Sequence, residues 1–478
     1  MGDEQQLSTF NFQLSTHRRI HFIGVGGIGM SALAHVLLDA GVKVSGSDAH
    51  ASRLTEELAA RRMRFSEGQR AENIAIMQPD LVVISAAVKE DNPELAAARA
   101  AGLPIIKRAE LLGQIMNRGK GIAVAGTHGK TTTSSMIAYL MSAAGADPTF
   151  LLGGVPQNLG RNGRLGKGEY IVAEADEYDG SFLKLRPYIS VITNIEADHL
   201  DFYADMKAIR AAFLEYAQNT GSGGALLICA DQAEAARLMA GLQATPHEYR
   251  LVSYGFAAGA SWRVADDGPN DAGGSNYRLW HDGAYLGDFR LKVPGTHNVQ
   301  NACAAIAACA YAGIEADAAA ALLADFRGTE RRLQVKGELS GVTVVDSYAH
   351  HPTEIATDLR AARRSYGNRR IVALFQPHTY SRTRSLLPAF ATAFTDADEV
   401  LISDIYAARE QDRGDIHAED IVKASDHPAM RYVGSLDEAE CYLTAALRRG
   451  DVLLTMGAGD VWQAGEKIVL SEKQLANS

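Results

Sequence analysis

The feature that most constrains the fold is a glycine-rich loop between a predicted strand and a predicted helix. The loop Gly126–Thr132 reads GTHGKTT; it follows the apolar run Gly121–Ala125 and precedes a helical stretch that ends near Ala144. Backbone amides of such a loop surround phosphate oxygens, while Lys130 can reach the β- and γ-phosphates and the Thr131 hydroxyl can bind Mg²⁺. Two residues separate its glycines, whereas the general phosphate-loop pattern has four. The sequence predicts a nucleotide-phosphate site here; a strand-to-helix turn without a ligand is the alternative.

Apolar strand-like runs alternate with amphipathic helical stretches along all 478 residues. This alternation predicts an α/β fold of parallel sheets covered by helices. At about 100–200 residues per domain, the length suggests three domains. We predict a Rossmann-like N-terminal domain over 1–108, a central P-loop-type ATPase domain over 109–325, and a Rossmann-like C-terminal domain over 326–478.

The first domain opens with a second glycine turn. Gly24–Gly29 reads GVGGIG, follows the predicted strand Arg19–Ile23 and precedes a helix that ends near Ala40. Asp48 lies about 20 residues further on, at the end of the next strand, as in dinucleotide-binding folds. Such a turn lets a diphosphate approach backbone N–H groups at a helix start. NAD, a nucleotide-sugar diphosphate and a purely structural turn all remain open on this motif alone.

Two predicted strands of the central domain end in groups that can bind a metal. Glu174 closes the strand Tyr170–Glu174, and His199 follows the strand Ile189–Ile195. Ligands of open parallel sheets bind at the carboxyl ends of the strands, so both side chains are expected near Thr131. A carboxylate and an imidazole there can hold the cation that neutralises phosphate charge. The alternative is a solvated acidic loop with a capping histidine.

Two asparagines begin an alanine-rich stretch that is predicted to be helical to about Ala312. Asn298 and Asn301 are three residues apart and would share one helix face. An amide can both donate to and accept from an adenine edge. On sequence alone, however, a helix cap is the favoured interpretation of Asn298.

Polar side chains are dense after two predicted strands of the third domain. The segment 346–354 (DSYAHHPTE) follows Val342–Asp346, and 376–384 (QPHTYSRTR) follows Arg370–Phe375. We expect these strands to be adjacent, so that both segments form one ligand site. Arg331, at the start of this domain, carries a guanidinium suited to phosphate or carboxylate, although a surface arginine is the usual alternative.

Composition narrows the class of protein further. The net charge of −10 and the pI of about 5.8 argue against a nucleic-acid binder. The N-terminus lacks the features of a signal peptide, and apolar runs stay below the ~18 residues of a membrane span. We therefore expect a cytoplasmic protein without membrane insertion. The cysteines form no Cys-x-x-Cys pair and are expected to be buried thiols in a reducing compartment; they are Cys229, Cys303, Cys309 and Cys441.

In combination, the motifs resemble those of the Mur ligase family over nearly the whole chain, and most closely those of its alanine-adding members. The motifs in chain order are GVGGIGMSALA, SGSD, GTHGKTTT, EADEYDGSF, NIEADHLDFY, PGTHNVQNA, GTERRLQ, DSYAHHPTE and QPHTYSRT. The resemblance implies that ATP phosphorylates the carboxylate of UDP-N-acetylmuramate and that L-alanine attacks the acyl phosphate. It also implies Mg²⁺ or Mn²⁺, domain closure, a monomer or homodimer, and a role in peptidoglycan synthesis, hence in cell shape and division.

The resemblance also implies roles position by position. The ATP site would comprise Gly126, Thr127, His128, Gly129, Lys130, Thr131, Thr132, His297, Asn298, Asn301, Arg331 and Asp346. The UDP-sugar site would comprise Gly26, Gly27, Ile28, Gly29, Ser47, Asp48, Ser85 and His128. The amino acid would meet Tyr348, His350, His378 and Arg382, and the metal would bind Thr131, Glu174 and His199. The residues expected to be catalytic are Lys130, His199, Arg331, His350, His378 and Arg382.

Three positions depart from the alanine-adding pattern. Ser347 and Ala349 replace Asp and Gly of many members, and Tyr178 replaces a common Ser. In these changes the chain resembles the murein tripeptide-recycling ligase, and that activity is the second hypothesis. An NAD-dependent dehydrogenase and a non-enzymatic nucleotide-binding regulator are further alternatives. The segment 212–214 reads Ala-Phe-Leu, so we predict no carbamylated lysine of the kind found in some sister ligases.

Overall fold

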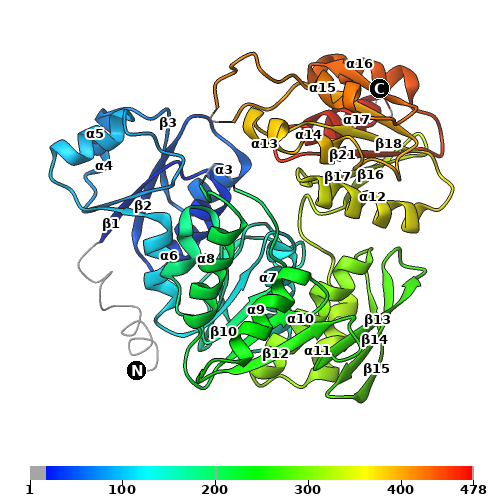
Figure 1. Ribbon diagram of the computed structural model, residues 1–478. Coiled ribbons are helices and arrows are strands. Elements are labelled where there is room, and N and C mark those ends of the chain that lie inside the picture. The colour runs from blue at the N-terminus through cyan, green and yellow to red at the C-terminus, as the bar shows by residue number, and fades with distance from the viewer. Residues whose placement is uncertain (1–17, 200–201, 409, 476–478) are drawn as a thin grey trace. The chain divides into compact units, whose positions relative to one another are not determined.

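The computed structural model describes residues 18–199, 202–408 and 410–475 (Figure 1). The chain divides into two compact units. The first comprises the chain up to Ala265 with Arg278–Phe289 and Gln300–Arg327; the second comprises Asp266–Tyr277, Arg290–Val299 and the chain from Gly328. Three sheets organise these residues. They match the predicted three-domain α/β architecture, while the predicted domain boundaries remain predictions.

The first sheet has five parallel strands in the order β3-β2-β1-β4-β5. The strands are β1 (Arg19–Ile23), β2 (Lys43–Asp48), β3 (Arg64–Glu67), β4 (Leu81–Ile84) and β5 (Ile105–Lys107). The helices are α2 (Ile28–Asp39), α3 (Arg53–Ala60), α4 (Glu72–Met77), α5 (Pro93–Ala100) and α6 (Arg108–Met116). The strand order reverses between β1 and β4. Ligands bind at such a reversal, outside the carboxyl ends of the strands.

The central sheet has the order β15-β14-β13-β12-β11-β10-β6-β9-β7-β8. Its strands are β6 (Lys120–Ala125), β7 (Thr149–Leu151), β8 (Gly163–Arg164), β9 (Tyr170–Glu174), β10 (Ile189–Ile192), β11 (Ala225–Cys229), β12 (Arg250–Gly255), β13 (Trp262–Pro269), β14 (Ser275–His281) and β15 (Ala284–Leu291). The helices are α7 (Lys130–Ala143), the 3-10 helix η3 (Tyr178–Lys184), α8 (Met206–Gln218), α9 (Ala233–Gln243), α10 (Thr296–Tyr311), α11 (Ala316–Leu322) and η4 (Leu323–Asp325). Because β9 and β10 flank β6 in parallel, the segments that follow all three strands lie at one sheet edge.

The third sheet has the order β16-β17-β21-β18-β19-β20, with β16 antiparallel to β17 and the other pairs parallel. Its strands are β16 (Gln334–Leu339), β17 (Val342–Ser347), β18 (Ile371–Phe375), β19 (Glu399–Ser403), β20 (Met430–Gly434) and β21 (Val452–Met456). The helices are α12 (Pro352–Tyr366), α13 (Tyr380–Ser385), α14 (Leu387–Phe390), α15 (Glu419–Ala424), α16 (Leu436–Ala446) and α17 (Trp462–Leu475).

Apolar strands buried on both faces explain why this third sheet forms. Alternate residues of one strand point to opposite faces, and the two faces of β18 enter different clusters. Phe375 packs in one cluster with Leu359 of α12, and Leu374 packs in the other with Leu443 of α16 and Ile468 of α17. Helices therefore cover both faces, as expected for a parallel sheet.

Four sequence-based expectations need correction. The strands β17 and β18 are not adjacent, because β21 pairs with both of them. β10 ends at Ile192 and not at Ile195. Helix α10 begins at Thr296, so Asn298 lies inside its first turn and is not its cap. Cys441 is exposed and not buried, because Ala439 and Leu443 turn the opposite face of α16 to the core.

No helix in the described part of the chain combines the length and the apolarity that a membrane span requires.

Candidate active site

The loop Gly126–Thr132 connects β6 to α7 in a shape that requires glycine at two positions. Gly126 has φ +130° and Gly129 has φ +81°, and residues other than glycine rarely adopt such backbone conformations. A methyl group on Gly126 would lie 2.1 Å from Oγ1 of Thr193, and one on Gly129 would lie 2.7 Å from Oδ1 of Asn301. The loop leads into the start of α7. The backbone N–H groups of the first turn of a helix have no partner within the helix, so they attract anions.

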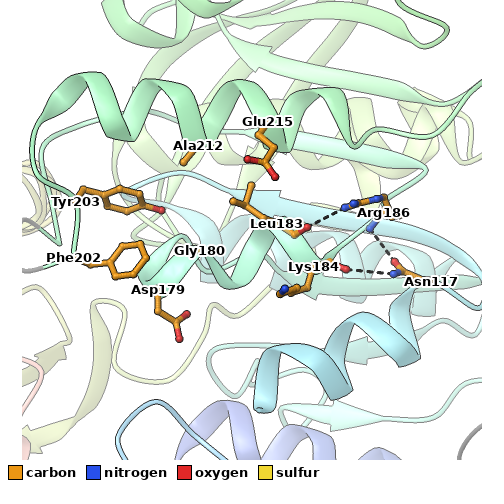
Figure 2. Close-up of a pocket in the computed structure, with 10 residues that line it drawn as sticks. All are labelled: Asn117, Asp179, Gly180, Leu183, Lys184, Arg186, Phe202, Tyr203, Ala212 and Glu215. Atoms are coloured by element: carbon orange, nitrogen blue, oxygen red, sulfur yellow. Dashed lines mark hydrogen bonds between the residues drawn. The ribbon is translucent and has the colours of Figure 1, made fainter. Parts of the chain in front are cut away.

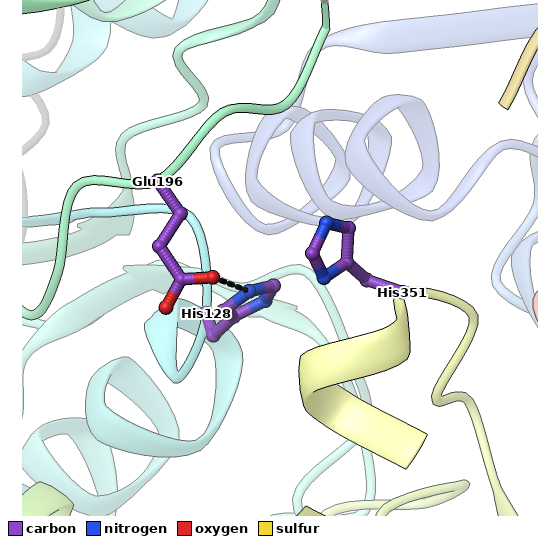
Figure 3. A group of neighbouring side chains, drawn as sticks. All are labelled: His128, Glu196 and His351. Carbon is purple, nitrogen blue, oxygen red and sulfur yellow. Dashed lines mark hydrogen bonds and ion pairs between the residues drawn. The ribbon is translucent and has the colours of Figure 1, made fainter. Parts of the chain in front are cut away.

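The segment after β10 braces this loop. The Thr193 hydroxyl donates to the carbonyl of His128 (2.6 Å), which also accepts from Nδ2 of Asn194 (3.0 Å). The backbone N–H of His128 donates to Oδ1 of Asn194 (2.8 Å). The ring of His128 lies 3.3 Å from the carboxylate of Glu196 (Figure 3). These hydrogen bonds hold the predicted phosphate loop against the segment that follows β10.

Lys130 turns inward within the loop. Its ammonium donates to the carbonyls of Gly126 (2.6 Å) and Thr127 (3.2 Å) and forms an ion pair with Glu177. Burial would lower the pKa of Lys130, but the surrounding carboxylates, above all Glu177, outweigh burial and raise it. Lys130 is therefore a permanent cation at physiological pH.

The structure brings together Thr131 and Glu174, two of the three predicted metal ligands. The hydroxyl of Thr131 donates to Oε2 of Glu174 (2.8 Å), which also accepts from the backbone N–H of Gly153 (3.1 Å). A methyl group on Gly153 would lie 2.2 Å from the same oxygen, so glycine makes room for the carboxylate. Thr131 and Glu174 both offer oxygen atoms, which Mg²⁺ prefers as ligands.

His199, the third predicted ligand, lies beside Glu177 and Asp198. Its backbone has φ +53°, and its N–H donates to Oδ1 of Asp198 (2.8 Å). Nε2 lies 4.0 Å from Glu177, and the ring packs 5.1 Å from that of Tyr178. Glu177 thus lies between Lys130 and His199.

The glycine turn of the first domain is closed by Asp48. The backbone N–H of Gly26 donates to Oδ2 of Asp48 (2.8 Å), and Gly24 has φ +83°. Ser85, after β4, accepts from the N–H of Ala87 (3.3 Å). These residues lie where the strand order reverses, together with the predicted Gly27, Ile28 and Gly29.

Ser47 lies at the same strand end but its side chain faces the interior. It is fully buried, and its hydroxyl donates to the buried carboxylate of Glu94. Nδ2 of Asn73 also donates to Glu94 (2.6 Å). Any contact of Ser47 with a ligand would therefore involve its backbone.

The four residues predicted for the amino acid form one cluster. The ring of His350 lies 5.3 Å from that of Tyr348 and 5.9 Å from that of His378. Nη1 of Arg382 lies 3.2 Å from Nδ1 of His378. Two segments that follow different strands thus meet, although β21 separates the strands.

Arg331, which is half-buried, pairs with the buried Asp346 beside this cluster. Nε of Arg331 donates to Oδ2 of Asp346 (3.1 Å), and Nη2 donates to the carbonyl of Gly457 after β21 (2.7 Å). Oδ1 of Asp346 accepts from the hydroxyl of Thr455 (2.9 Å). Burial raises the pKa of Asp346, and Arg331 opposes the rise. The guanidinium of Arg331 also packs 5.0 Å from the Tyr348 ring.

The three residues predicted for adenine open α10. Asn298 and Asn301 are each 7% exposed, and Nδ2 of Asn298 donates to the carbonyl of Pro294 (2.7 Å). Burial, followed by Arg332, lowers the pKa of His297 to about 4. A neutral imidazole at physiological pH is compatible with contact to an uncharged base.

A separate pocket of about 630 Å³ lies beside η3 and α8 (Figure 2). Phe202, which is half exposed, and Tyr203 line one end of it; Arg186 and Asn117 line the other. The hydroxyl of Tyr203 donates to the carbonyl of Glu177 (2.6 Å). Among the described residues that line this pocket, none belongs to the predicted site.

Sequence reasoning missed several residues of this arrangement. Glu177 is one of them, although it belongs to the same acidic strand-end motif as Glu174. Asn194 and Glu196 occur in the motif of His199, and their bracing role was not predicted. Gly457, whose carbonyl accepts from Arg331, directly follows the apolar strand β21. Its position at a strand end is the sequence signal that places it near a site.

Comparison with known proteins covers nearly the whole chain. The models described as "Mur ligase family, catalytic domain", "Mur ligase middle domain" and "Mur ligase, glutamate ligase domain" match residues 19–120, 124–309 and 331–459. A UDP-N-acetylmuramate–L-alanine ligase of Caldanaerobacter subterraneus is 43% identical over 467 residues, which cover 96% of this chain and 99% of that protein.

Solved structures agree with this similarity. The UDP-N-acetylmuramate-alanine ligase of Thermotoga maritima superimposes with a TM-score of 0.81 at 29% identity, covering 96% of this chain and 100% of that one. A murein peptide ligase of Psychrobacter arcticus gives 0.73 at 26% identity, covering 95% and 98%.

Proposed function

This chain belongs to the Mur ligase family, and we propose that it joins L-alanine to the carboxylate of UDP-N-acetylmuramate with ATP as the energy source. The observation that carries the proposal is the 43% identity, over 96% of the chain, to a relative named for this reaction. A cationic phosphate loop beside a carboxylate pair supports it independently. The product would enter peptidoglycan precursor synthesis in the cytoplasm.

The reaction would proceed in two steps. A carboxylate oxygen of the muramyl group attacks the γ-phosphorus of ATP, and the bond to the bridging oxygen breaks to release ADP. The amine of L-alanine then attacks the acyl carbon, loses a proton, and expels inorganic phosphate. Lys130 and the amides at the start of α7 would stabilise the negative charge that shifts during phosphoryl transfer.

Thr131, Glu174 and His199 would hold the metal. The oxygen atoms of Thr131 and Glu174, 2.8 Å apart, fit Mg²⁺, and the imidazole nitrogen of His199 extends the set to metals such as Mn²⁺. When bound, the cation would neutralise phosphate charge. Glu177 would remain a negatively charged neighbour of Lys130 and His199 when Lys130 contacts phosphate and His199 binds the metal.

We assign substrate contacts by motif and placement. Asn298, Asn301 and His297 would contact adenine; Arg331 and Asp346 would serve the phosphates and ribose. The Tyr348–His350–His378–Arg382 cluster would bind the amino acid, since its cation and imidazoles suit a carboxylate. The glycine turn Gly24–Gly29 would bind UDP in place of NAD, because Asp48 is already bonded to that turn. The protein would act as a monomer or a homodimer.

The second candidate is the tripeptide-recycling activity. The placement of Ser347 weighs against it: the side chain is fully buried and donates to Asp358, and the N–H of Ala349 donates back to its hydroxyl (3.0 Å). The departure from the alanine-adding pattern therefore changes bonding inside the loop and not a surface that meets substrate.

Phosphate release separates the candidates. The enzyme is incubated with ATP, Mg²⁺ and UDP-N-acetylmuramate, and a panel of amines is compared. We expect L-alanine first, with glycine and L-serine weaker. Release only with L-alanyl-γ-D-glutamyl-diaminopimelate would establish the tripeptide activity. NAD binding without UDP-sugar affinity would favour a dehydrogenase, and absence of release under every combination would favour a non-enzymatic regulator.

A further inference from the structure

Arg108, the first residue of α6, lies against the glycine turn of the first domain. A methyl group built on Gly29 would lie 3.0 Å from Nη1 and 3.2 Å from Cδ of Arg108. Its Nη2 donates to Oδ2 of Asp176 (3.2 Å), and the side chain is 23% exposed. The absence of a side chain at Gly29 is what allows the guanidinium to approach the turn.

Arg108 lies beside the starts of two helices. Gly29 lies in the first turn of α2, where the helix carries partial positive charge. All residues of α2 are described, and none in its first turn is acidic. Arg108 also begins its own helix, α6, so its cation meets a second positive helix end. Carboxylates already lie beside both helix starts, since Asp48 accepts from the N–H of Gly26 and Glu110 lies in the first turn of α6. Asp176 accepts from Nη2 of Arg108, and a diphosphate at Gly29 would offer the guanidinium a second acceptor.

We propose that Arg108 binds the diphosphate of the nucleotide sugar at the Gly24–Gly29 turn and, through Asp176, positions the loop that carries Glu174 and Glu177. This inference rests on the proposed function. The planar guanidinium can offer paired N–H groups to phosphate oxygens while the turn offers backbone N–H groups.

Asp176 connects the two halves of the proposal. Its Oδ1 accepts from the N–H of Tyr178 (3.2 Å), and its carbonyl accepts from the N–H of Phe182 (2.9 Å). Asp176 therefore fixes the turn into η3, the segment that directly follows Glu177. Binding of UDP-sugar at Arg108 would thus order the carboxylates around Lys130.

The test compares UDP with uridine by calorimetry on the full-length protein. Arg108→Ala should weaken UDP binding about ten- to hundredfold, the loss of one or two charge-assisted hydrogen bonds, and leave uridine binding unchanged. Arg108→Lys should recover part of the affinity. Arg99→Ala, which removes an exposed arginine of α5, is the matched control and should bind UDP as the wild type does. Unchanged UDP affinity in Arg108→Ala, or an equal loss for uridine, would overturn the diphosphate contact.

The positioning role is read from kinetics. Asp176→Asn should lower kcat for phosphate release about tenfold or more while the dissociation constant of UDP changes less than threefold. An unchanged kcat would overturn this half of the proposal. Wild-type protein that binds no UDP and releases no phosphate would contradict the proposed function itself, whereas normal wild-type behaviour with a silent Arg108→Ala contradicts only the role of Arg108.

Discussion

Lys130 and Glu177 form a buried ion pair, with the ammonium nitrogen 2.9 Å from Oε2 and 3.0 Å from Oε1 of the carboxylate. The same ammonium donates to the carbonyls of Gly126 and Thr127. All these acceptors belong to the loop or to the carboxylate cluster beside it. The neighbouring carboxylates raise the pKa of Lys130 and keep it charged. Phosphate oxygens of a nucleotide would replace these acceptors.

Removal of Lys130 should slow phosphate release strongly. We expect Lys130→Ala to lower kcat by about a hundredfold or more, because this cation balances charge during phosphoryl transfer. Phosphate release at saturating ATP measures the effect. Lys207→Ala, which removes an exposed lysine of α8, is the matched control and should be silent. Near-normal turnover of Lys130→Ala would mean that the proposed phosphate site is wrong.

Glu174→Ala should change the metal requirement. The carboxylate accepts from Thr131 and Gly153, so its loss leaves Thr131 as the remaining oxygen ligand proposed. We expect the Mg²⁺ concentration for half-maximal rate to rise about tenfold or more. The rate is measured against Mg²⁺ at fixed ATP, with Glu215→Ala on α8 as the control. An identical Mg²⁺ curve would remove Glu174 from the proposed ligands.

Acid should weaken the first domain through His35. This residue of α2 is 2% exposed, and its Nδ1 lies 2.7 Å from Nη1 of Arg61. Burial, then Arg61 and Arg161, lower the pKa of His35 from 6.5 to about 4. A lowered histidine pKa favours the neutral form, so its stabilisation is complete above pH 6.5 and is lost as the pH falls towards 4. At pH 5 the loss is about 2 kcal/mol.

The measurement compares wild type with His35→Asn, whose amide oxygen can still accept from Arg61. Thermal unfolding at pH 7.5 and pH 5.0 gives a change in Tm for each protein. Between pH 7.5 and pH 5.0 the Tm of the wild type should fall more than that of the variant. All other titrating groups are common to both proteins, so the difference reports His35. Equal changes in Tm would show that His35 is not responsible.

The strand limits were largely predictable, whereas the strand order was not. β1 and β9 begin and end at the predicted residues, since each is an apolar run bounded by polar or glycine residues. Strands β7 and β8 have three and two residues, which are too few to show the alternating pattern that predicts a strand. The insertion of β21 between β17 and β18 depends on pairing between distant residues, such as Val344 with Leu453 and Ile371 with Val452, and local sequence carries no signal of it.

The candidate site was partly predictable for a related reason. Thr131 and Glu174 follow neighbouring parallel strands, and strand ends meet at one edge whatever the detailed loops. Glu177 depends on a loop shape: Asp179 and Gly180 both have positive φ, near 52° and 69°. This turn lies two residues after Glu177 and sets the direction of the chain there. The sequence motif alone does not predict such a turn.

Arg382→Ala should affect the amino acid and spare the nucleotide. Its guanidinium lies 3.2 Å from Nδ1 of His378, and the proposed cluster holds the carboxylate of L-alanine with this cation. We expect the KM for L-alanine to rise about tenfold or more, since a charge-assisted hydrogen bond is lost, while the KM for ATP changes less than threefold. Arg384 lies two residues further along α13 and pairs with Asp415 at the surface, so Arg384→Ala should leave both constants unchanged. If Arg382→Ala raises the KM for ATP and leaves that for L-alanine unchanged, the cluster serves the nucleotide and the assignment of the amino-acid site fails.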